Sequence, residues 1–181
     1  MPLWCGAFGG RLHVKRTVRA AAAAAAMAML PSIVDAADPA AIARGKYLVA
    51  IACCNDCHTP GYFFGKPDMA RFLGGSDVGF EMPGLGTFVG PNLTPDKATG
   101  LGSWTDAQVV TALQKGERPD GRMLAPIMPW HAFASLTKQD ADAIVAFLRS
   151  LPPVDHKVPG PFGANEAPTT FVMKIVPPPC K

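Results

Sequence analysis

The sequence predicts a small all-α domain with about three main helices joined by long loops. Three segments begin with a helix-capping residue and continue with apolar residues at helical spacing. The connections between them are rich in glycine and proline, of which the chain has 18 and 19. Its 181 residues suffice for one ordinary domain. Long loops are uncommon in compact domains unless they serve a function, and wrapping a large flat ligand would be one.

The first helix is expected over residues 40–53. Asp38 is a good N-cap, and Pro39 suits the first helical position, where the N–H that proline lacks would have no helical partner. Gly45 lies inside this segment, and a glycine within a helix costs about 1 kcal/mol relative to alanine. We therefore expect a packing reason for Gly45, such as another helix crossing closely.

Two further helices have clear start and stop signals. Thr105 and Gln108 form a capping box for the second, which is expected to stop at Gly116. The third begins after Thr137 and ends at a pair of prolines, residues 152–153. Its apolar stripe consists of Ile144, Phe147, Leu148 and Leu151.

Two stretches have no helical signal. Residues 59–103 are rich in glycine and proline and are expected to form a long loop. Residues 154–181 form a proline-rich tail with an apolar run at residues 171–176. We expect the tail to lie extended over a domain that spans residues 37–153; a partly disordered tail is the alternative.

Residues 1–36 are interpreted as a cleaved secretory signal peptide. Residues 1–19 are basic without an acidic residue, residues 20–30 are apolar and alanine-rich, and small residues follow near Ala36. The apolar run is too short to span a bilayer, and no transmembrane span is expected in the mature chain. A disordered, alanine-rich N-terminus is the alternative.

Cleavage would lower Lys+Arg from 17 to 13 and Asp+Glu from 14 to 13. Near-neutral charge gives no indication of nucleic-acid binding.

Residues 54–58 form the motif C-x-x-C-H, which indicates covalent attachment of one haem c. The thiols of Cys54 and Cys57 can add to the two haem vinyl groups, and His58 can then point its imidazole at the iron. A thioredoxin-like pair would need a βαβ context, and zinc would need a second pair of ligands at short spacing. Haem c is attached after export, which agrees with the leader and predicts a periplasmic protein.

The second axial ligand of the iron is expected to be Met128. It lies between Pro126 and Pro129, whose rings restrict the backbone, so that less freedom is lost when a weak ligand binds. A methionine ligand raises the reduction potential relative to a second histidine. Met123 is the runner-up, and His131 is the weaker alternative. Filling the core is the structural alternative for any single methionine.

The chain resembles a class I cytochrome c, and it is especially similar to haem domains of periplasmic cytochromes that accept electrons from dehydrogenases. The resemblance rests on residues 44–48, 54–60, 92–96, 99–104, 120–130 and 140–153. It implies His58 and Met128 as axial ligands. It also implies a close contact of Gly45 with Phe147 or its neighbours. Dehydrogenase cytochrome subunits often carry several such motifs, but this chain has one, so we expect a single haem.

Several residues near these motifs keep more than one interpretation. Cys53 and Cys180 could form a disulfide in an oxidising compartment, Cys53 could be an ordinary buried residue, or Cys180 could pair with another molecule. Trp104 and Trp130 could donate to a haem propionate or simply pack in the core. Arg118 and Arg122 could pair with propionates or remain solvated.

The sequence therefore predicts an electron carrier and not an enzyme. Two protein ligands leave no open position on the iron, so that only an electron can pass. A haem peroxidase or a gas-binding protein would need Met128 to be absent or displaceable. A structural role for the haem is the third possibility. The expected partners are a dehydrogenase as electron donor and a downstream cytochrome or oxidase.

Overall fold

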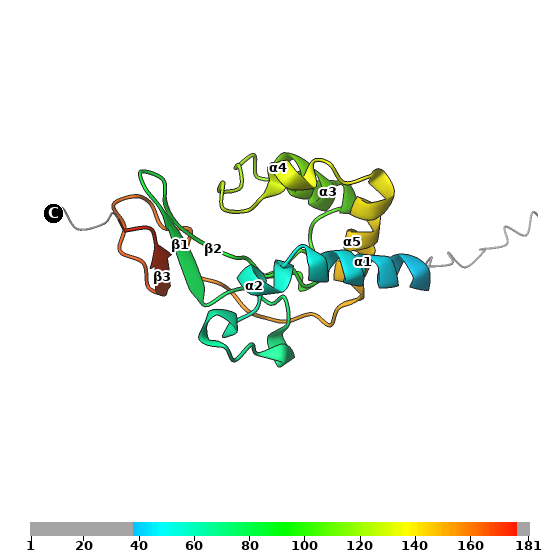
Figure 1. Ribbon diagram of the computed structural model, residues 1–181, viewed down its shortest axis with the longest axis horizontal. Helices are drawn as coiled ribbons and strands as arrows, with labels where there is room; N and C mark the ends of the chain where they lie inside the picture. The colour runs from blue at the N-terminus through cyan, green and yellow to red at the C-terminus, as the bar shows by residue number, and fades with distance from the viewer. Residues whose placement is uncertain (1–37, 177–181) are drawn as a thin grey trace, which may run out of the picture. The chain divides into compact units, whose positions relative to one another are not determined.

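The computed structural model describes residues 38–176, so the predicted leader and Cys180 lie outside the described residues. Five helices occur in this part of the chain, together with two short 3₁₀ turns at Tyr62–Phe64 and Met69–Arg71 (Figure 1). The helices are α1 (Pro39–Ile51), α2 (Cys54–His58), α3 (Asp106–Lys115), α4 (Trp130–Phe133) and α5 (Lys138–Ser150). The strands are β1 (Val78–Met82), β2 (Gly86–Val89) and β3 (Phe171–Lys174). None of the helices within residues 38–176 has the length and apolar character needed to cross a membrane.

The three predicted helices form where the capping signals place them. The Asp38 carboxylate accepts a hydrogen bond from the N–H of Ala40 at the start of α1. The predicted capping box of Thr105 and Gln108 is present at α3, which ends at Gly116 in the left-handed conformation. Thr137 caps α5. Local capping chemistry therefore sets these helix ends.

Helix α1 crosses α5 closely at Gly45, as the resemblance implies. A Cβ atom on Gly45 would overlap the backbone carbonyl of Ala143 and would lie 2.8 Å from the Cβ of Phe147. Glycine is therefore required by the close approach, which explains its place inside a helix. Buried side chains from α1, α3, α5 and the neighbouring loops form the core: Leu48, Val49, Leu73, Leu101, Val109, Ile144, Val145, Phe147 and Leu148.

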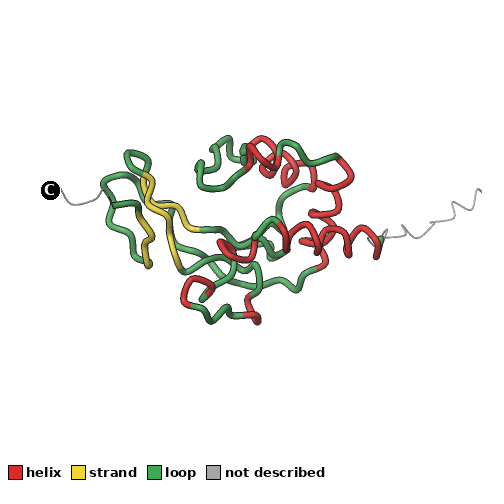
Figure 2. The backbone as a smooth tube through the Cα atoms, in the orientation of Figure 1, coloured by secondary structure: helices red, strands yellow, loops and turns green. Residues whose placement is uncertain are grey.

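The prediction of an all-α fold is not confirmed, because a small sheet stands beside the helices (Figure 2). Its strand order is β2-β1-β3, with β1 antiparallel to β2 and parallel to β3. Strands β1 and β2 lie inside the segment expected to be a loop, residues 59–103. They are short and glycine-rich, and β1 obtains its second partner from a segment far along the chain. Local sequence could therefore not indicate the sheet.

The tail after α5 returns along the domain to the sheet. Phe162 pairs with Thr87, and residues 171–174 add β3 to the edge of β1. The Thr170 hydroxyl also donates to the carbonyl of Asp77 at 2.6 Å. In the described residues the tail is thus extended against the domain, with its strand beside β1 in Figure 1.

A buried hydrogen-bond network around Asn92 connects the loops to this tail. The Asn92 amide donates to the carbonyl of Val154 at 2.7 Å and to the Thr99 hydroxyl at 3.0 Å. Its oxygen accepts from both the backbone N–H and the hydroxyl of Thr94. Asn92 and Thr94 are almost fully buried, so these groups have no access to water as an alternative partner.

We predict that Gly45→Ala destabilises the protein by about 1–3 kcal/mol, because the added methyl group forces α1 and α5 apart. Helix propensity alone would predict the opposite sign, a gain of about 1 kcal/mol. Thermal or denaturant unfolding measures the difference. Gly163→Ala is the control, since Gly163 is exposed and an added Cβ there meets almost nothing. A Gly45→Ala variant as stable as the parent would contradict this account of the crossing.

We predict that Asn92→Ala lowers the free energy of unfolding by about 2–3 kcal/mol, because it leaves several buried donors and acceptors unpaired. Asn165→Ala, at an exposed position of the tail, should change it by less than about 0.5 kcal/mol. Urea denaturation of both variants tests the difference. Equal stability of the two variants would mean that the network contributes nothing.

Candidate cofactor site

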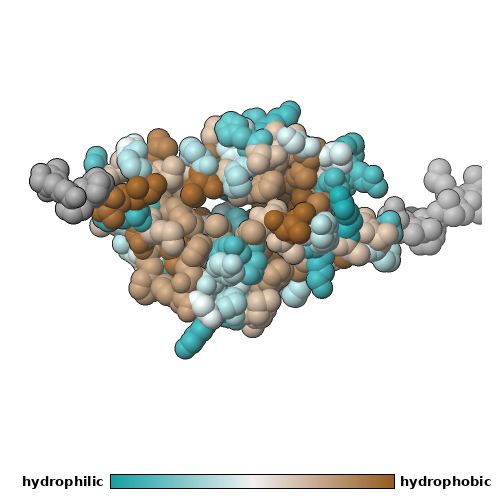
Figure 3. Space-filling model, viewed as in Figure 1, coloured by the Kyte–Doolittle hydropathy of each residue, from teal (hydrophilic) through white to brown (hydrophobic). Residues whose placement is uncertain are grey.

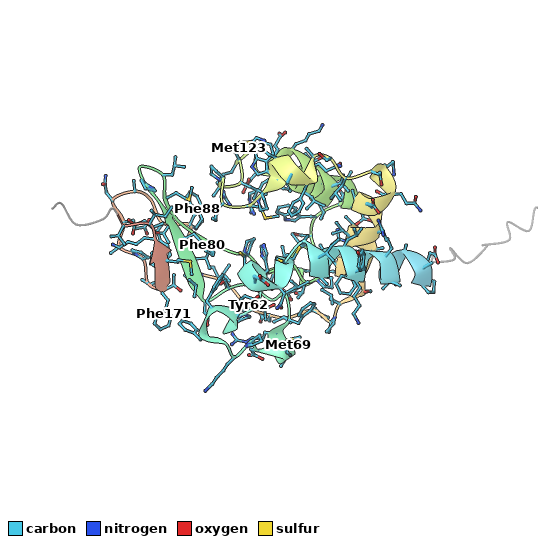
Figure 4. All side chains as sticks on the ribbon, in the orientation of Figure 1. Tyr62, Met69, Phe80, Phe88, Met123 and Phe171 are labelled. Atoms are coloured by element: carbon cyan, nitrogen blue, oxygen red, sulfur yellow. The ribbon has the colours of Figure 1, made fainter. Side chains whose placement is uncertain are left out.

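A cavity of about 630 Å³ lies between the helices, the sheet and the tail. Figure 3 shows an opening in this face of the molecule, with both hydrophobic and hydrophilic residues around it. Phe80 and Phe88, labelled in Figure 4, line the cavity from β1 and β2. Other parts of its wall come from the end of α1, α2, α3, α5 and residues 158–161 of the tail.

Helix α2 presents the predicted attachment residues to this cavity. The expected helix over residues 40–53 ends early, at Ile51, because Cys53 adopts the left-handed conformation with φ 54°. The chain then starts a new helical turn at Cys54. Residues three and four apart share one face of a helix, so Cys54, Cys57 and His58 all line the same cavity.

His58 is oriented by a hydrogen bond to Pro91, the residue that precedes Asn92. Its side chain is buried, and Nδ1 lies 2.8 Å from the carbonyl oxygen of Pro91. The tautomer protonated at Nδ1 donates to this carbonyl and leaves the Nε2 lone pair available to a metal. Burial lowers the pKa of His58, which favours the neutral, ligating form.

The loop carrying Pro91 packs tightly against α2. A Cβ atom on Gly90 would overlap the carbonyl group of Cys57 and lie 3.4 Å from the Nδ1 of His58. Glycine therefore permits the close approach that brings the Pro91 carbonyl to the imidazole. Burial also raises the pKa of the Cys54 thiol to about 11 and raises that of Cys57, so both thiols are protonated at neutral pH.

Met128 lines the cavity from the loop between α3 and α4. The loop is held by backbone hydrogen bonds from Met128 to Ala125 at 2.9 Å and from Trp130 to Met128 at 2.8 Å. Among the methionines within residues 38–176, Met128 alone lines the cavity. The side chain of Met123 is half-exposed, and His131 is exposed; neither contributes to the cavity wall.

Arg118 and Arg122 add positive charge to the wall, which Trp104 also lines. The guanidinium of Arg118 lies 4.9 Å from the centre of the Trp104 ring and pairs with Asp120 at 3.3 Å. Arg122 forms no ion pair with any described residue. Burial lowers its pKa, and the neighbouring charge of Arg118 lowers it further. This wall therefore suits an anionic group, such as the carboxylates of haem.

Trp130 lies outside the cavity wall and has a packing role. Its ring stacks on His131 with the ring centres 3.5 Å apart, and it covers Gly116 at the end of α3. The Trp130 Nε1 is buried and has no hydrogen-bond partner among the described residues. Of the two tryptophans considered from the sequence, Trp104 alone is placed to contact a ligand in the cavity.

The residues of the cavity fit a haem c. Helix α2 supplies two thiols and an imidazole, and a separate loop supplies the thioether of Met128. The rest of the wall is largely apolar and includes Arg118 and Arg122. Within residues 38–176, no three His, Cys, Asp or Glu side chains converge as a zinc site would require. Sequence reasoning missed Phe80, Phe88 and residues 158–161, because short strands and an extended tail carry no motif.

Comparisons with known proteins agree with this fit. The sequence profile of the cytochrome c family matches residues 42–152. The chain is 38% identical over 111 residues to the cytochrome c subunit of a quinone-dependent alcohol dehydrogenase from Gluconobacter oxydans, covering 61% of this chain and 21% of that subunit. It is 36% identical over 119 residues to the fructose dehydrogenase cytochrome subunit of Gluconobacter japonicus, covering 65% and 23%.

A third relative matches a longer part of this chain. The gluconate 2-dehydrogenase cytochrome c subunit of Pantoea cypripedii is 32% identical over 133 residues, which cover 70% of this chain and 28% of that subunit. In all three comparisons the match spans less than a third of the relative's length.

We predict that Arg122→Gln makes the reduction potential of the haem-loaded protein more negative, because a nearby positive charge favours the ferrous state. Partial exposure screens this charge, so the expected change is at most about 1 kcal/mol. A spectroscopic redox titration measures it. Lys115→Gln removes the same charge at an exposed residue outside the cavity and should have a smaller effect. Equal shifts in both variants would contradict a role for Arg122 in the cavity.

Proposed function

The chain belongs to the cytochrome c family, and from this premise we propose that it is a single-haem electron carrier of the periplasm. It accepts electrons from a dehydrogenase and passes them to the respiratory chain. Bound haem c supplies a one-electron iron couple. Cys54 and Cys57 would hold the haem covalently, and His58 and Met128 would bind its iron.

The position of Met128 is the observation that carries this proposal. A thioether on a loop held by prolines and backbone hydrogen bonds lines the same cavity as His58. With both His58 and Met128 bound to the iron, a substrate would have no position to bind, and the site could only exchange electrons. A peroxidase or a gas-binding haem protein is the alternative function, and it requires an iron that Met128 leaves open.

The proposed partners and location rest on other observations. The relatives described above are cytochrome subunits of dehydrogenases, which supports a dehydrogenase as the donor. Export is supported by the basic and then apolar pattern of residues 1–36. Without the leader the charge is near neutral, which favours docking through an apolar rim over strong electrostatic steering. One C-x-x-C-H motif in the sequence supports one haem.

We predict that the native protein has a low-spin, six-coordinate haem in both oxidation states and that Met128→Ala opens the iron to carbon monoxide. Removing the thioether leaves the iron with a vacant or water-bound position, which absorption spectra of the ferrous protein with and without carbon monoxide detect. Met123→Ala is the matched control, because Met123 lies outside the cavity wall. A native ferrous form that binds carbon monoxide readily would favour the alternative function. Unchanged spectra of Met128→Ala would exclude Met128 as the ligand.

A further inference from the structure

Residues 154–162 lie beyond the part of the chain that matches the cytochrome c family, yet they contact the cofactor site. We call this segment the strap. It is separated from the end of α5 by residues 151–153 and leads to the sheet, and its residues 158–161 form part of the cavity wall. The wall residues that it contributes are valine, two prolines and glycine, which present no polar side chain to the cavity.

Both ends of the strap are held by hydrogen bonds. At its start, the N–H of His156 donates to the Thr99 hydroxyl at 3.1 Å, and the His156 Nδ1 lies 2.7 Å from the carbonyl oxygen of Gly74. At its end, the backbone of Phe162 exchanges two hydrogen bonds with Thr87, at 2.9 and 3.0 Å. The side chain of Phe162 is buried. The residues between these anchors are therefore held across the cavity.

The strap lies close to the chain that carries the iron ligand. A Cβ atom on Gly75 would overlap the side chain of Val158, so the two segments are in close contact. The N–H of Gly75 in turn donates to the carbonyl of His58 at 2.8 Å. Val158 is thus separated from the His58 backbone by a single residue of the neighbouring loop.

We propose that the strap closes the His58 side of the haem cavity against water and thereby raises the reduction potential of the haem. This inference rests on the proposed function. Ferric haem carries one more positive charge than ferrous haem, and an apolar surrounding disfavours the more highly charged state. Solvent access and the apolar shell around a metal site are known to set its potential. The reduction potential of the haem therefore depends in part on the strap, which lies outside the part of the chain that matches the family.

The test compares two valine-to-serine variants of the haem-loaded protein by spectroscopic redox titration. Val158→Ser places a hydroxyl at the cavity wall, and Val172→Ser makes the same change at a half-buried position of β3 outside the cavity. A third variant ends after Lys157, which removes the wall residues together with Phe162 and β3 but keeps the His156 anchors. Each protein is first checked for covalent haem with a low-spin spectrum.

We expect Val158→Ser to shift the potential to more negative values by at least ~28 mV. This value corresponds to a threefold change in the ratio of oxidised to reduced protein, since tenfold is about 59 mV for one electron. The shortened chain should shift further in the same direction, and Val172→Ser should not shift. If the shortened chain does not fold, the two serine variants decide the question.

An unchanged potential in Val158→Ser, or an equal shift in Val172→Ser, would overturn the role of the strap. Either result with a low-spin haem in the parent protein would leave the proposed electron carrier intact. Conversely, a parent protein without covalent low-spin haem would refute the proposed function itself. The two failures are therefore distinguishable.

Discussion

The close approach of α1 and α5 at Gly45 is the contact on which the rest of the structure depends. Because Gly45 lacks a side chain, the backbone of α1 can rest directly on Ala143 and Phe147 of α5. The crossing buries most of the apolar stripe of α5, and α1 then ends at Ile51, before the left-handed residue Cys53. The short helix α2 follows that end immediately, so the packing of two helices determines where its cysteines and histidine stand.

Loops build most of the cavity around α2, and buried polar groups hold these loops in place. The Pro91 carbonyl orients the imidazole of His58, and the neighbouring Asn92 fastens this loop to Thr99 and to the start of the tail. An irregular backbone has few regular hydrogen bonds of its own. Buried side-chain partners replace them. They fix the positions of the loops, as a site that is to hold a metal requires.

The walls of the cavity have distinct chemical characters. The wall at α2 offers thiols and a neutral imidazole, the opposite loop offers a thioether, and Arg118 and Arg122 supply positive charge at another part of the wall. The sheet and the strap are apolar where they meet the cavity. This separation suits a flat, largely apolar cofactor that also carries a metal and carboxylates.

The sequence by itself determined the three longer helices, through the caps Asp38, Thr105 and Thr137, and it contains the C-x-x-C-H motif of residues 54–58. These features are local, because a cap or a motif acts within one or two helical turns. Only the tertiary structure decided the sheet, the cavity walls formed by Phe80 and Phe88, and the strap. In each of these, residues far apart in sequence meet through pairing or burial, and neither spacing nor composition records which segments will meet. Met128 depends on both. Its proline-rich loop indicated it in the sequence, but only the fold brings it to the cavity that His58 lines.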